Sequence, residues 1–549
     1  MKKTMMILLV LAMLFAVLCA GCSGENAGST ASASGGSFAV VGDADTNYVE
    51  AIVAKVNTLT GAEPAVYSPK NAPAQPCIVA GNPDELNVGD MIAEVPYFGY
   101  LVTVRNGNVY ILAYHDEVLA EAASVFLREL EGWTANGKIK PAEGYEVLQT
   151  VSVTFSENDV PYLEGGENAS VHNYDNGHQV VTLEGVSKAE FEAYCAKLEA
   201  EGFKLHGENE INGNRFMTYA NSSGKMIHTY WTEYFGEARI VVATTDLLPF
   251  TSEAKNPVDC IPLLYQMEGE DEEGYILRLA DGRFLIVDGG NPTEENADEI
   301  YNFLKKNAPD ADNIVIAAWY ITHAHTDHCG AVEAFAGKYG NDSTIDVECF
   351  LFNPCETSEQ MLYCEISYKL NMEVALAAYY PNVPVYKPLT GQVYTFGKTT
   401  VEILYTMSDF MPNTIEYEID GKGGDYNVMS TVCIIDIDST QDLKDRFFVM
   451  GDTTTVACNE MCYRYGDAMK CDFVQMSHHG LSVLPNAKNC RRHCATVEIY
   501  ELIDPSIALW PASVEKAKER SVLEVNDYLM SIVDQVVIAG EGGFTFEIK

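Results

Sequence analysis

The stretch Ile321-Thr-His323-Ala-His325-Thr-Asp327-His328-Cys-Gly330 decides the fold, because it places three of the chain's eleven histidines and a carboxylate within six residues. Apolar residues 313–321 before it predict a buried strand, and residues 330–338 after it predict a helix. Residues two apart on an extended chain point the same way, so His323 and His325 can bind one ion together. The turn then presents Asp327 and His328 to a neighbouring position. Imidazole and carboxylate ligands suit zinc, with manganese or iron as alternatives.

The motif His323-Ala-His325-Thr-Asp327-His328 resembles the metal-binding signature of the metallo-β-lactamase fold superfamily. Three further elements resemble the family's and follow in its order: the strand ending at Asp288-Gly289, the strand ending at Gly451-Asp452, and His478-His479-Gly480. The resemblance covers about residues 256–549 and implies an α/β fold, the αββα sandwich, for that part of the chain.

The same resemblance implies a site for two divalent metal ions, zinc before manganese or iron, that hold a hydroxide between them. Asp452 would bridge the two ions, and Asp288, Asn427 and Ser430 would support the site without touching an ion. The implied metal ligands are His323, His325, Asp327, His328, Asp452 and His479. Asp327 and His478 are the candidate catalytic residues.

The roles of the two adjacent histidines follow from strand geometry. Neighbouring residues on a strand point to opposite faces, so both can ligate one ion only if the strand ends or kinks between them. His479 directly precedes Gly480, where the backbone can turn away, and it is therefore the predicted ligand. His478 would face the substrate and act as a hydrogen-bond donor or general acid. A structural hydrogen bond is its alternative role.

A subgroup can be named from three segments. Residues 427–432, the Gly451-Asp452 strand end and residues 478–480 resemble the hydrolase domain of bacterial DNA-uptake competence proteins and the teichoic-acid phosphorylcholine esterases. Both groups act on phosphodiesters. The chain departs from the wider family in having no histidine in residues 329–477, and it has Leu481 where the competence proteins have serine. The resemblance therefore implies phosphodiester hydrolysis and leaves the substrate open.

The N-terminus is typical of an export signal. Two lysines and a short apolar run precede Ala20-Gly21-Cys22, which resembles a lipoprotein processing site, with simple secretion as the alternative. Residues 23–37, rich in Ser, Gly and Ala, predict a flexible tether after the signal of residues 1–22. We therefore expect the protein on the extracellular face of the cell membrane, anchored by a lipid on Cys22.

Charge restricts the partners. The chain has 35 basic and 79 acidic residues and a net charge of −44, and no basic run exceeds adjacent pairs. Such a surface repels polyanions, which argues against nucleic-acid binding without excluding it. The favoured substrate is a small-molecule or cell-envelope phosphodiester.

Two small domains should precede the hydrolase part. Alternating strand and helix patterns predict an α/β domain at residues 38–148, with a hairpin turn at Asn106-Gly107. A capping box at Ser187 and Glu190, followed by strand-like runs, predicts an α+β domain at residues 150–250. The Tyr and Trp side chains in residues 229–234 fit a carbohydrate platform or ordinary strand packing. The roles of both domains stay open.

Three functions are therefore compatible with the sequence. The first is a surface-anchored, metal-dependent phosphodiesterase. The second is a hydrolase of esters, lactones or β-lactams on the same metal pair. The third is a glycan-binding lipoprotein whose hydrolase domain is degenerate.

Overall fold

The computed structural model describes residues 38–548 apart from single positions and short segments, the longest being 151–160, 355–365, 411–425, 439–444 and 482–494. The predicted signal peptide, Cys22 and the tether lie outside the described residues. The chain divides into two compact units, residues 1–153 and 154–549.

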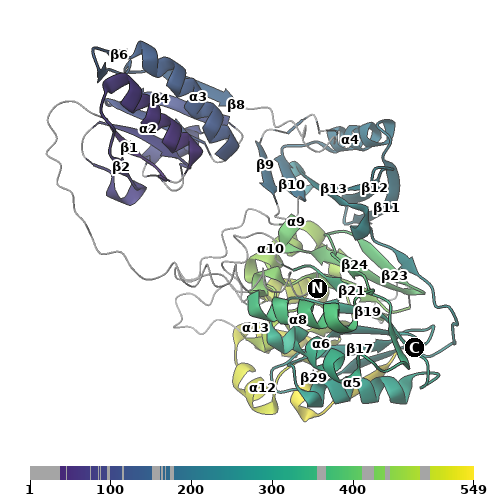
Figure 1. Cartoon of the computed structure of the whole chain (residues 1–549). Coiled ribbons are helices and arrows are strands. Elements are labelled where there is room, and N and C mark those ends of the chain that lie inside the picture. The colour runs from purple at the N-terminus through teal and green to yellow at the C-terminus, as the bar shows by residue number, and fades with distance from the viewer. Residues whose placement is uncertain are drawn as a thin grey trace, which may run out of the picture. The chain divides into compact units, whose positions relative to one another are not determined.

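The N-terminal unit is a six-stranded sheet in the order β2-β1-β3-β5-β4-β8. Helices α2 (Asn47–Thr60) and α3 (Asp116–Gly132) pack together on it (Figure 1). The predicted hairpin is present, because Asn106 and Gly107 take φ of 52° and 75° between β4 and β5. The strands are β1 (Ala39–Val41), β2 (Val66–Tyr67), β3 (Cys77–Gly81), β4 (Gly99–Arg105), β5 (Asn108–Leu112) and β8 (Glu146–Thr150), with a small hairpin of β6 (Thr134–Ala135) and β7 (Lys138–Ile139).

The C-terminal unit begins with an antiparallel sheet in the order β11-β12-β13-β14-β10-β9. Helix α4 (Lys188–Ala200) starts at the predicted capping box, in which Ser187 and Glu190 exchange hydrogen bonds. Tyr230 and Trp231 are 0% and 7% exposed, so both pack as strand residues instead of forming a surface platform. The strands are β9 (Asn168–Asn173), β10 (Gln179–Glu184), β11 (Lys204–Ile211), β12 (Asn214–Ala220), β13 (Lys225–Thr232) and β14 (Glu237–Thr244).

This accessory sheet is docked on the chain that follows it, residues 251–549, by buried polar contacts. Tyr230 and Arg239 both donate to the backbone oxygen of Asp409, at 2.7 and 3.0 Å. The carboxylate of Glu237 accepts from Arg464, which is 3% exposed at its side chain. Buried polar groups need such partners, and here the two parts supply them to each other. The accessory sheet is therefore an integral part of the C-terminal unit.

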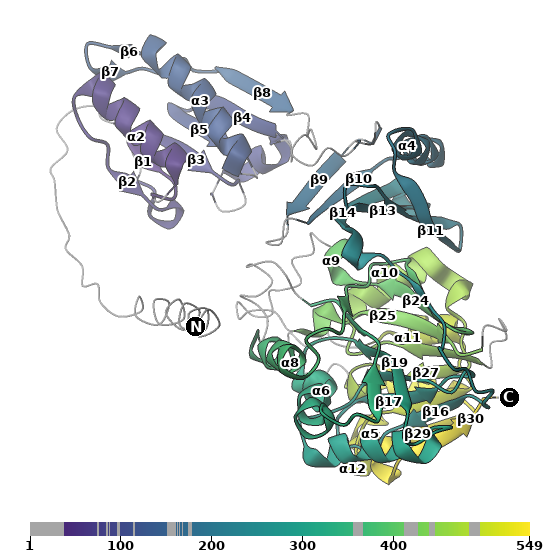
Figure 2. The ribbon, with the colours of Figure 1, turned by 45° about the vertical axis from the view of Figure 1, so that its right-hand side comes forward.

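The remaining chain forms the expected αββα sandwich, so the predicted fold class is confirmed. One sheet, here called the β19 sheet, has the order β22-β21-β19-β18-β17-β16-β30, with β20 also paired to β19. The other, here called the β26 sheet, has the order β15-β23-β24-β25-β26-β27-β28-β29. A fully buried apolar layer fills the space between them and includes Val287, Tyr320, Phe447 and Val449. Figure 2 shows α5, α6 and α8 outside the β19 sheet and α10 and α11 beside the β26 sheet.

The strands of the β19 sheet are β16 (Leu263–Gln266), β17 (Gly274–Arg278), β18 (Phe284–Asp288), β19 (Ile314–Ile321), β20 (Ile345–Val347), β21 (Phe350–Phe352), β22 (Val385–Tyr386) and β30 (Phe544–Glu547). Those of the β26 sheet are β15 (Thr251–Ser252), β23 (Val393–Phe396), β24 (Thr399–Tyr405), β25 (Val432–Asp436), β26 (Arg446–Val449), β27 (Phe473–Gln475), β28 (Ile507–Trp510) and β29 (Gln535–Ile538). The helices are α5 (Glu294–Asn307), α6 (Thr326–Tyr339), α8 (Ile366–Tyr379), α9 (Met407–Phe410), α10 (Thr455–Tyr465), α11 (Val497–Ile503), α12 (Val514–Arg520) and α13 (Glu524–Ile532).

Parallel pairing brings the candidate residues to one end of the sandwich. β18 is parallel to β19, and β26 is parallel to β27, so the carboxyl ends within each pair meet at the same edge. These are the strand ends that precede the segments singled out in the sequence.

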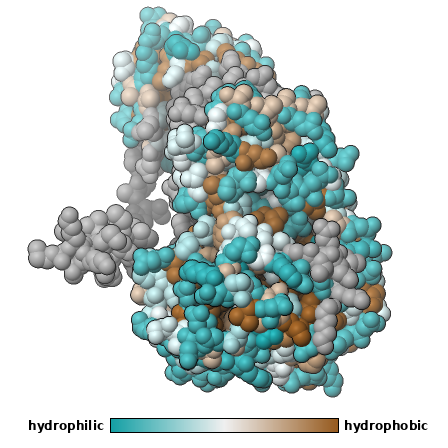
Figure 3. Space-filling model, turned by 90° about the vertical axis from the view of Figure 1, so that its right-hand side faces the viewer, coloured by the Kyte–Doolittle hydropathy of each residue, from teal (hydrophilic) through white to brown (hydrophobic). Residues whose placement is uncertain are grey.

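Much of the face seen in Figure 3 is covered by hydrophilic side chains, and the apolar patches on it are separated. Within the described residues, no helix is both long enough and apolar enough to span a bilayer.

Candidate metal centre

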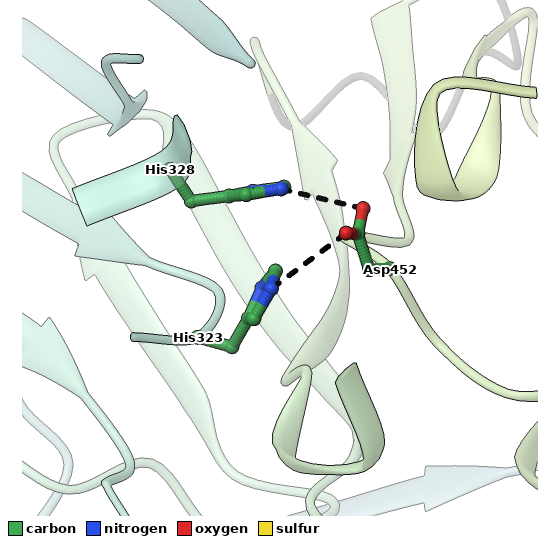
Figure 4. Close-up of side chains that lie close together, drawn as sticks. All are labelled: His323, His328 and Asp452. Carbon is green, nitrogen blue, oxygen red and sulfur yellow. Dashed lines mark ion pairs between the residues drawn. The ribbon is translucent and has the colours of Figure 1, made fainter. Parts of the chain in front are cut away.

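The histidine motif lies on one side of the Asp452 carboxylate. β19 ends at Ile321, His323 follows in the turn, and α6 begins at Thr326, which puts His328 in its first turn. His323 Nε2 lies 3.7 Å from Asp452 Oδ2, and His328 Nε2 lies 3.3 Å from Asp452 Oδ1 (Figure 4). His325 is joined to this group through its Nδ1, 3.1 Å from His323 Nε2. The structure therefore brings the three rings of the motif together.

Asp288 supports the motif through hydrogen bonds to Thr322 and His328. Its carboxylate accepts from the backbone N–H of Thr322 at 2.8 Å and from the Thr322 hydroxyl at 2.7 Å. It also accepts from His328 Nδ1 at 2.8 Å, which leaves the lone pair of His328 Nε2 facing Asp452. Asp288 itself takes φ of 53°, an uncommon conformation for a side-chain-bearing residue. Its placement fits the supporting role that the sequence predicts.

Asp452 is presented by a tight turn after β26. Gly451 has φ of 53°, and a Cβ there would lie 2.9 Å from the Thr322 Cβ, so only glycine fits. The backbone N–H of Asp452 donates to Ser430 Oγ at 3.0 Å. Ser430 therefore supports Asp452 directly, while the side-chain amide of Asn427 lies 3.3 Å from His478 Nε2.

His478 and His479 form a left-handed turn, with φ of 50° and 52°. β27 has already ended at Gln475, so the alternation of a strand does not apply to them. Both rings turn toward Asp452: His478 Nε2 and His479 Nε2 lie 3.7 and 3.8 Å from its Oδ2. His479 Nε2 also lies 3.2 Å from Asp327 Oδ2.

Three side chains fix this turn. His479 Nδ1 donates to the backbone oxygen of Pro511 at 2.9 Å, and the backbone oxygen of His479 accepts from Trp510 Nε1 at 2.9 Å. Arg520 donates to the same oxygen at 2.7 Å. The ring of His479 is thereby held with its Nε2 lone pair toward the carboxylates.

Sequence reasoning missed two supporting residues, Glu273 and Gln475. The backbone N–H of Glu273 donates to the backbone oxygen of Asp327 at 2.9 Å, and its carboxylate accepts from Gln475 Nε2 at 2.8 Å. Gln475 in turn bonds Met450 N and Gly451 O, next to Asp452. Burial, together with neighbouring carboxylates, raises the pKa of Glu273 well above its usual value. An acidic residue directly before the apolar run of β17 was the signal available in the sequence.

The donor set fits divalent cations. His328 Nε2, Asp452 Oδ1 and His479 Nε2 are buried and make no hydrogen bond to any described residue. Nitrogen lone pairs that face a carboxylate repel it unless a cation lies between them. Two ligand atoms that each lie 2.0–2.1 Å from a tetrahedral zinc ion are about 3.3 Å from each other. The distances of 3.1–3.8 Å between the nitrogen and oxygen atoms given above are close to this ligand–ligand distance. Potential ligand atoms group as His323–His328–Asp452 and as Asp327–His328–His479.

The charges around His328 and Asp452 also favour a bound cation. Burial alone would lower the pKa of His328, yet the charges of Asp452 and Asp288 raise it well above its usual value. Burial would raise the pKa of Asp452, but His328, His478 and His479 lower it. The cluster is therefore a negative environment in which metal ions can take the place of protons on the imidazoles.

Residues 274–348, which contain the histidine motif, match the family model described as the metallo-beta-lactamase superfamily. The match is to this segment of the sandwich alone. In the sandwich, the residues implied by the resemblance lie together at the strand ends. A comparison with curated proteins finds no match.

Solved structures similar to the domain come from several bacteria. The metallo-β-lactamase fold protein YhfI from Bacillus subtilis is 12% identical over 52% of this chain and 99% of its own, with a TM-score of 0.31. A possible metal-dependent hydrolase from Veillonella parvula is 12% identical over 52% and 98%, with a TM-score of 0.28. CmlA, a diiron β-hydroxylase from Streptomyces venezuelae, is 11% identical over 52% and 54%, with a TM-score of 0.33.

Proposed function

We propose that this protein is a metal-dependent phosphodiesterase anchored by a lipid at the outer face of the cell membrane. The observation that carries the proposal is that the buried Nε2 atoms of His323, His328 and His479 all lie 3.3–3.8 Å from carboxylate oxygens of Asp452. A degenerate domain that only binds glycans has no use for such a set, because each buried lone pair without a partner costs stability.

The residues divide the work of hydrolysis between them. When bound, two divalent cations supply positive charge to a developing oxyanion and lower the pKa of a water molecule. Asp452 would hold these cations together with His323, His328 and His479, whose Nε2 atoms lie 3.3–3.8 Å from its carboxylate oxygens. Asp327, with 30% of its side chain exposed against 2% for Asp452, is the carboxylate that solvent and substrate reach. It is therefore placed to receive a proton as well as to ligate.

Phosphodiesters are the favoured substrates because the segments that resemble phosphodiester hydrolases line Asp452. Asn427, in η5 (Tyr426–Met429), and His478 contact each other beside it. The net charge of −44 disfavours long polyanions at the same site. We therefore expect small or zwitterionic diesters, such as phosphocholine esters, to be cleaved faster than duplex DNA.

A substrate panel with metal analysis tests the function. The purified protein should contain two divalent ions and hydrolyse a small phosphodiester, whereas Asp452→Ala should lose metal and several orders of magnitude in rate while it stays folded. Faster cleavage of an ester, lactone or β-lactam than of any diester would favour the second function. A protein that holds no metal, cleaves nothing and binds glycans would refute the enzyme.

The anchor has its own test. Cys22→Ala should stall processing or release the protein to the medium, as followed by cell fractionation. Unchanged membrane association of the variant would argue against a lipid on Cys22.

A further inference from the structure

A polar cavity of about 470 Å³ lies where β11 of the accessory sheet meets the β26 sheet. Asn209 lines it from β11, and three neighbouring strands of the β26 sheet contribute Thr400, Glu402, Ile434, Asp436 and Arg446. The volume falls within the ~300–1,000 Å³ of small-molecule sites. The accessory sheet therefore helps to enclose a space that a ligand can occupy.

The cavity is separate from the candidate metal centre. The apolar residues next to Glu402, Asp436 and Arg446 in the chain belong to the layer between the two sheets. Because side chains alternate along a strand, these three point to the other face of the β26 sheet. Arg446 begins β26, whereas Asp452 follows its end, so the cavity also lies at the opposite end of that strand.

Two opposite charges line this cavity without pairing with each other. Glu402 Oε1 accepts from Asn209 Nδ2 at 2.9 Å. Arg446 donates to two backbone oxygens, those of Lys470 and Ala468, at 2.7 and 3.3 Å. Within the part of the chain that the structure describes, neither Glu402 nor Arg446 has an oppositely charged group within ion-pair distance. Their strands, β24 and β26, are two strand spacings apart, about 10 Å.

Both charges can accept a further partner. Burial raises the pKa of Glu402, and the Asn209 amide and the Arg446 charge offset this only in part. A cation inside the cavity would replace the solvation that the carboxylate has lost. The guanidinium of Arg446 has further N–H groups for a carboxylate or phosphate. Asp436 adds a second carboxylate to the wall, so a ligand has to bring positive charge as well as negative.

Ile434 provides apolar surface between the two charges. It lies on β25, between the strands of Glu402 and Arg446, is paired directly with Glu402, and is 2% exposed. A ligand that reaches from Glu402 to Arg446 therefore crosses an apolar floor. Its two charged groups are best placed at the ends of a short apolar stem.

We propose that this cavity binds a small zwitterion, with its ammonium group at Glu402 and its carboxylate or phosphate at Arg446. The proposal goes beyond the phosphodiesterase, because it describes a second site on the other face of the β26 sheet. It also assigns a role to the accessory sheet, since the amide of Asn209 orients the Glu402 carboxylate.

Isothermal titration calorimetry with three probes tests the charge pattern. ε-Aminocaproate carries an ammonium and a carboxylate at the ends of an apolar stem, while hexylamine and hexanoate carry one charge each. The purified protein should bind ε-aminocaproate at least ~10-fold more tightly than either, the ratio that one charge-assisted hydrogen bond supplies. Glycylglycine and phosphoethanolamine, titrated next, distinguish a peptide from a lipid headgroup as the source of the zwitterion.

Variants locate the binding. Glu402→Gln keeps the size of the side chain and removes its charge, so the affinity for ε-aminocaproate should fall about 10-fold while that for hexanoate stays the same. Arg446→Gln should weaken ε-aminocaproate and hexanoate and leave hexylamine unchanged. Arg446→Lys, which keeps the charge and loses the planar fork, should weaken the same two probes less and serves if the glutamine variant does not fold. Glu208→Gln, which changes an exposed carboxylate of β11, should bind all three probes like wild type.

Two results would overturn the proposal. The first is equal affinity for the three probes, or no binding of ε-aminocaproate. The second is binding of ε-aminocaproate that survives both Glu402→Gln and Arg446→Gln, because the probe would then lie elsewhere, for example at the metal centre. Diester hydrolysis is measured separately, so neither result would refute the phosphodiesterase.

Discussion

At the scale of single residues, the site depends on carboxylates that never reach substrate. Asp288 is fully buried and bonds Thr322 and His328 together, so it fixes which nitrogen of His328 carries the proton. The Glu273 carboxylate accepts from Gln475, which bonds the backbone beside Asp452, while the Glu273 backbone N–H donates to the backbone oxygen of Asp327. Such groups tune a metal site through its ligands.

Asp288→Asn tests this support. The amide keeps the size of the side chain but provides one acceptor where the carboxylate provides two. We expect zinc affinity, measured by chelator competition, to fall about 10–100-fold with little change in fold. Asp298→Asn, which removes a carboxylate from an exposed ion pair with Lys338, should leave the affinity unchanged. Equal affinities in the two variants would contradict the role of Asp288.

At the scale of elements, the decisive feature is the end of β27, where the chain turns through His478 and His479 against β28. Trp510 on β28 reaches the His479 carbonyl only because the next residue has no side chain: a Cβ on Gly480 would lie 2.6 Å from Trp510 Nε1. The turn at His478 and His479 and strand β28 therefore depend on each other for their packing.

Gly480→Ala should disrupt the packing of this turn against β28. The variant combines the strain of φ +68° with the clash against Trp510, so it should lose metal and be less stable by more than the ~1 kcal/mol of conformational strain alone. Gly61→Ala is the control, since Gly61 is left-handed at φ +72° and nothing lies within 4 Å of where its Cβ would be. Thermal melts and zinc titrations compare the two. Similar losses in both variants would show that the Trp510 contact is unimportant.

The sequence predicts local patterns well and long-range contacts poorly. The histidine motif, the capping box at Ser187 and the Asn106-Gly107 hairpin were readable because each depends on neighbours in the chain. The bond from Gln475 to Glu273 spans 202 positions, and no periodic pattern marks it. The directions of the His478 and His479 rings depend on such contacts too, because what packs on the end of a strand decides where the strand ends.

At the scale of the whole molecule, the docked accessory sheet sets the limits of the unit that carries the candidate metal centre. Arg464 is buried and shares Glu237 with Arg239, so separation of the two parts would remove this carboxylate and leave Arg464 only its ion pair with Glu460, at 3.5 Å. Removal of one partner of a buried ion pair costs about 3–5 kcal/mol. The predicted boundary near residue 250 therefore separates two architectures that share one folding unit.

Truncation measures this dependence. Residues 154–549 should fold, bind metal and retain activity, because this unit is compact by itself. Residues 256–549 should unfold at lower temperature or aggregate. A fragment of residues 256–549 that melts like the longer one would show that the docking contacts add no stability.

The turn at His478 and His479 also has an evolutionary side. An L-amino acid in the left-handed region costs about 1–2 kcal/mol, and two in succession double that cost. Glycine at either position would relieve the strain, so selection for heat resistance alone would erase these histidines. A D-histidine, the mirror-image building block, would keep the imidazole and lose the strain, which makes chemical synthesis of this segment a way to ask how much stability the enzyme has given up for its metal.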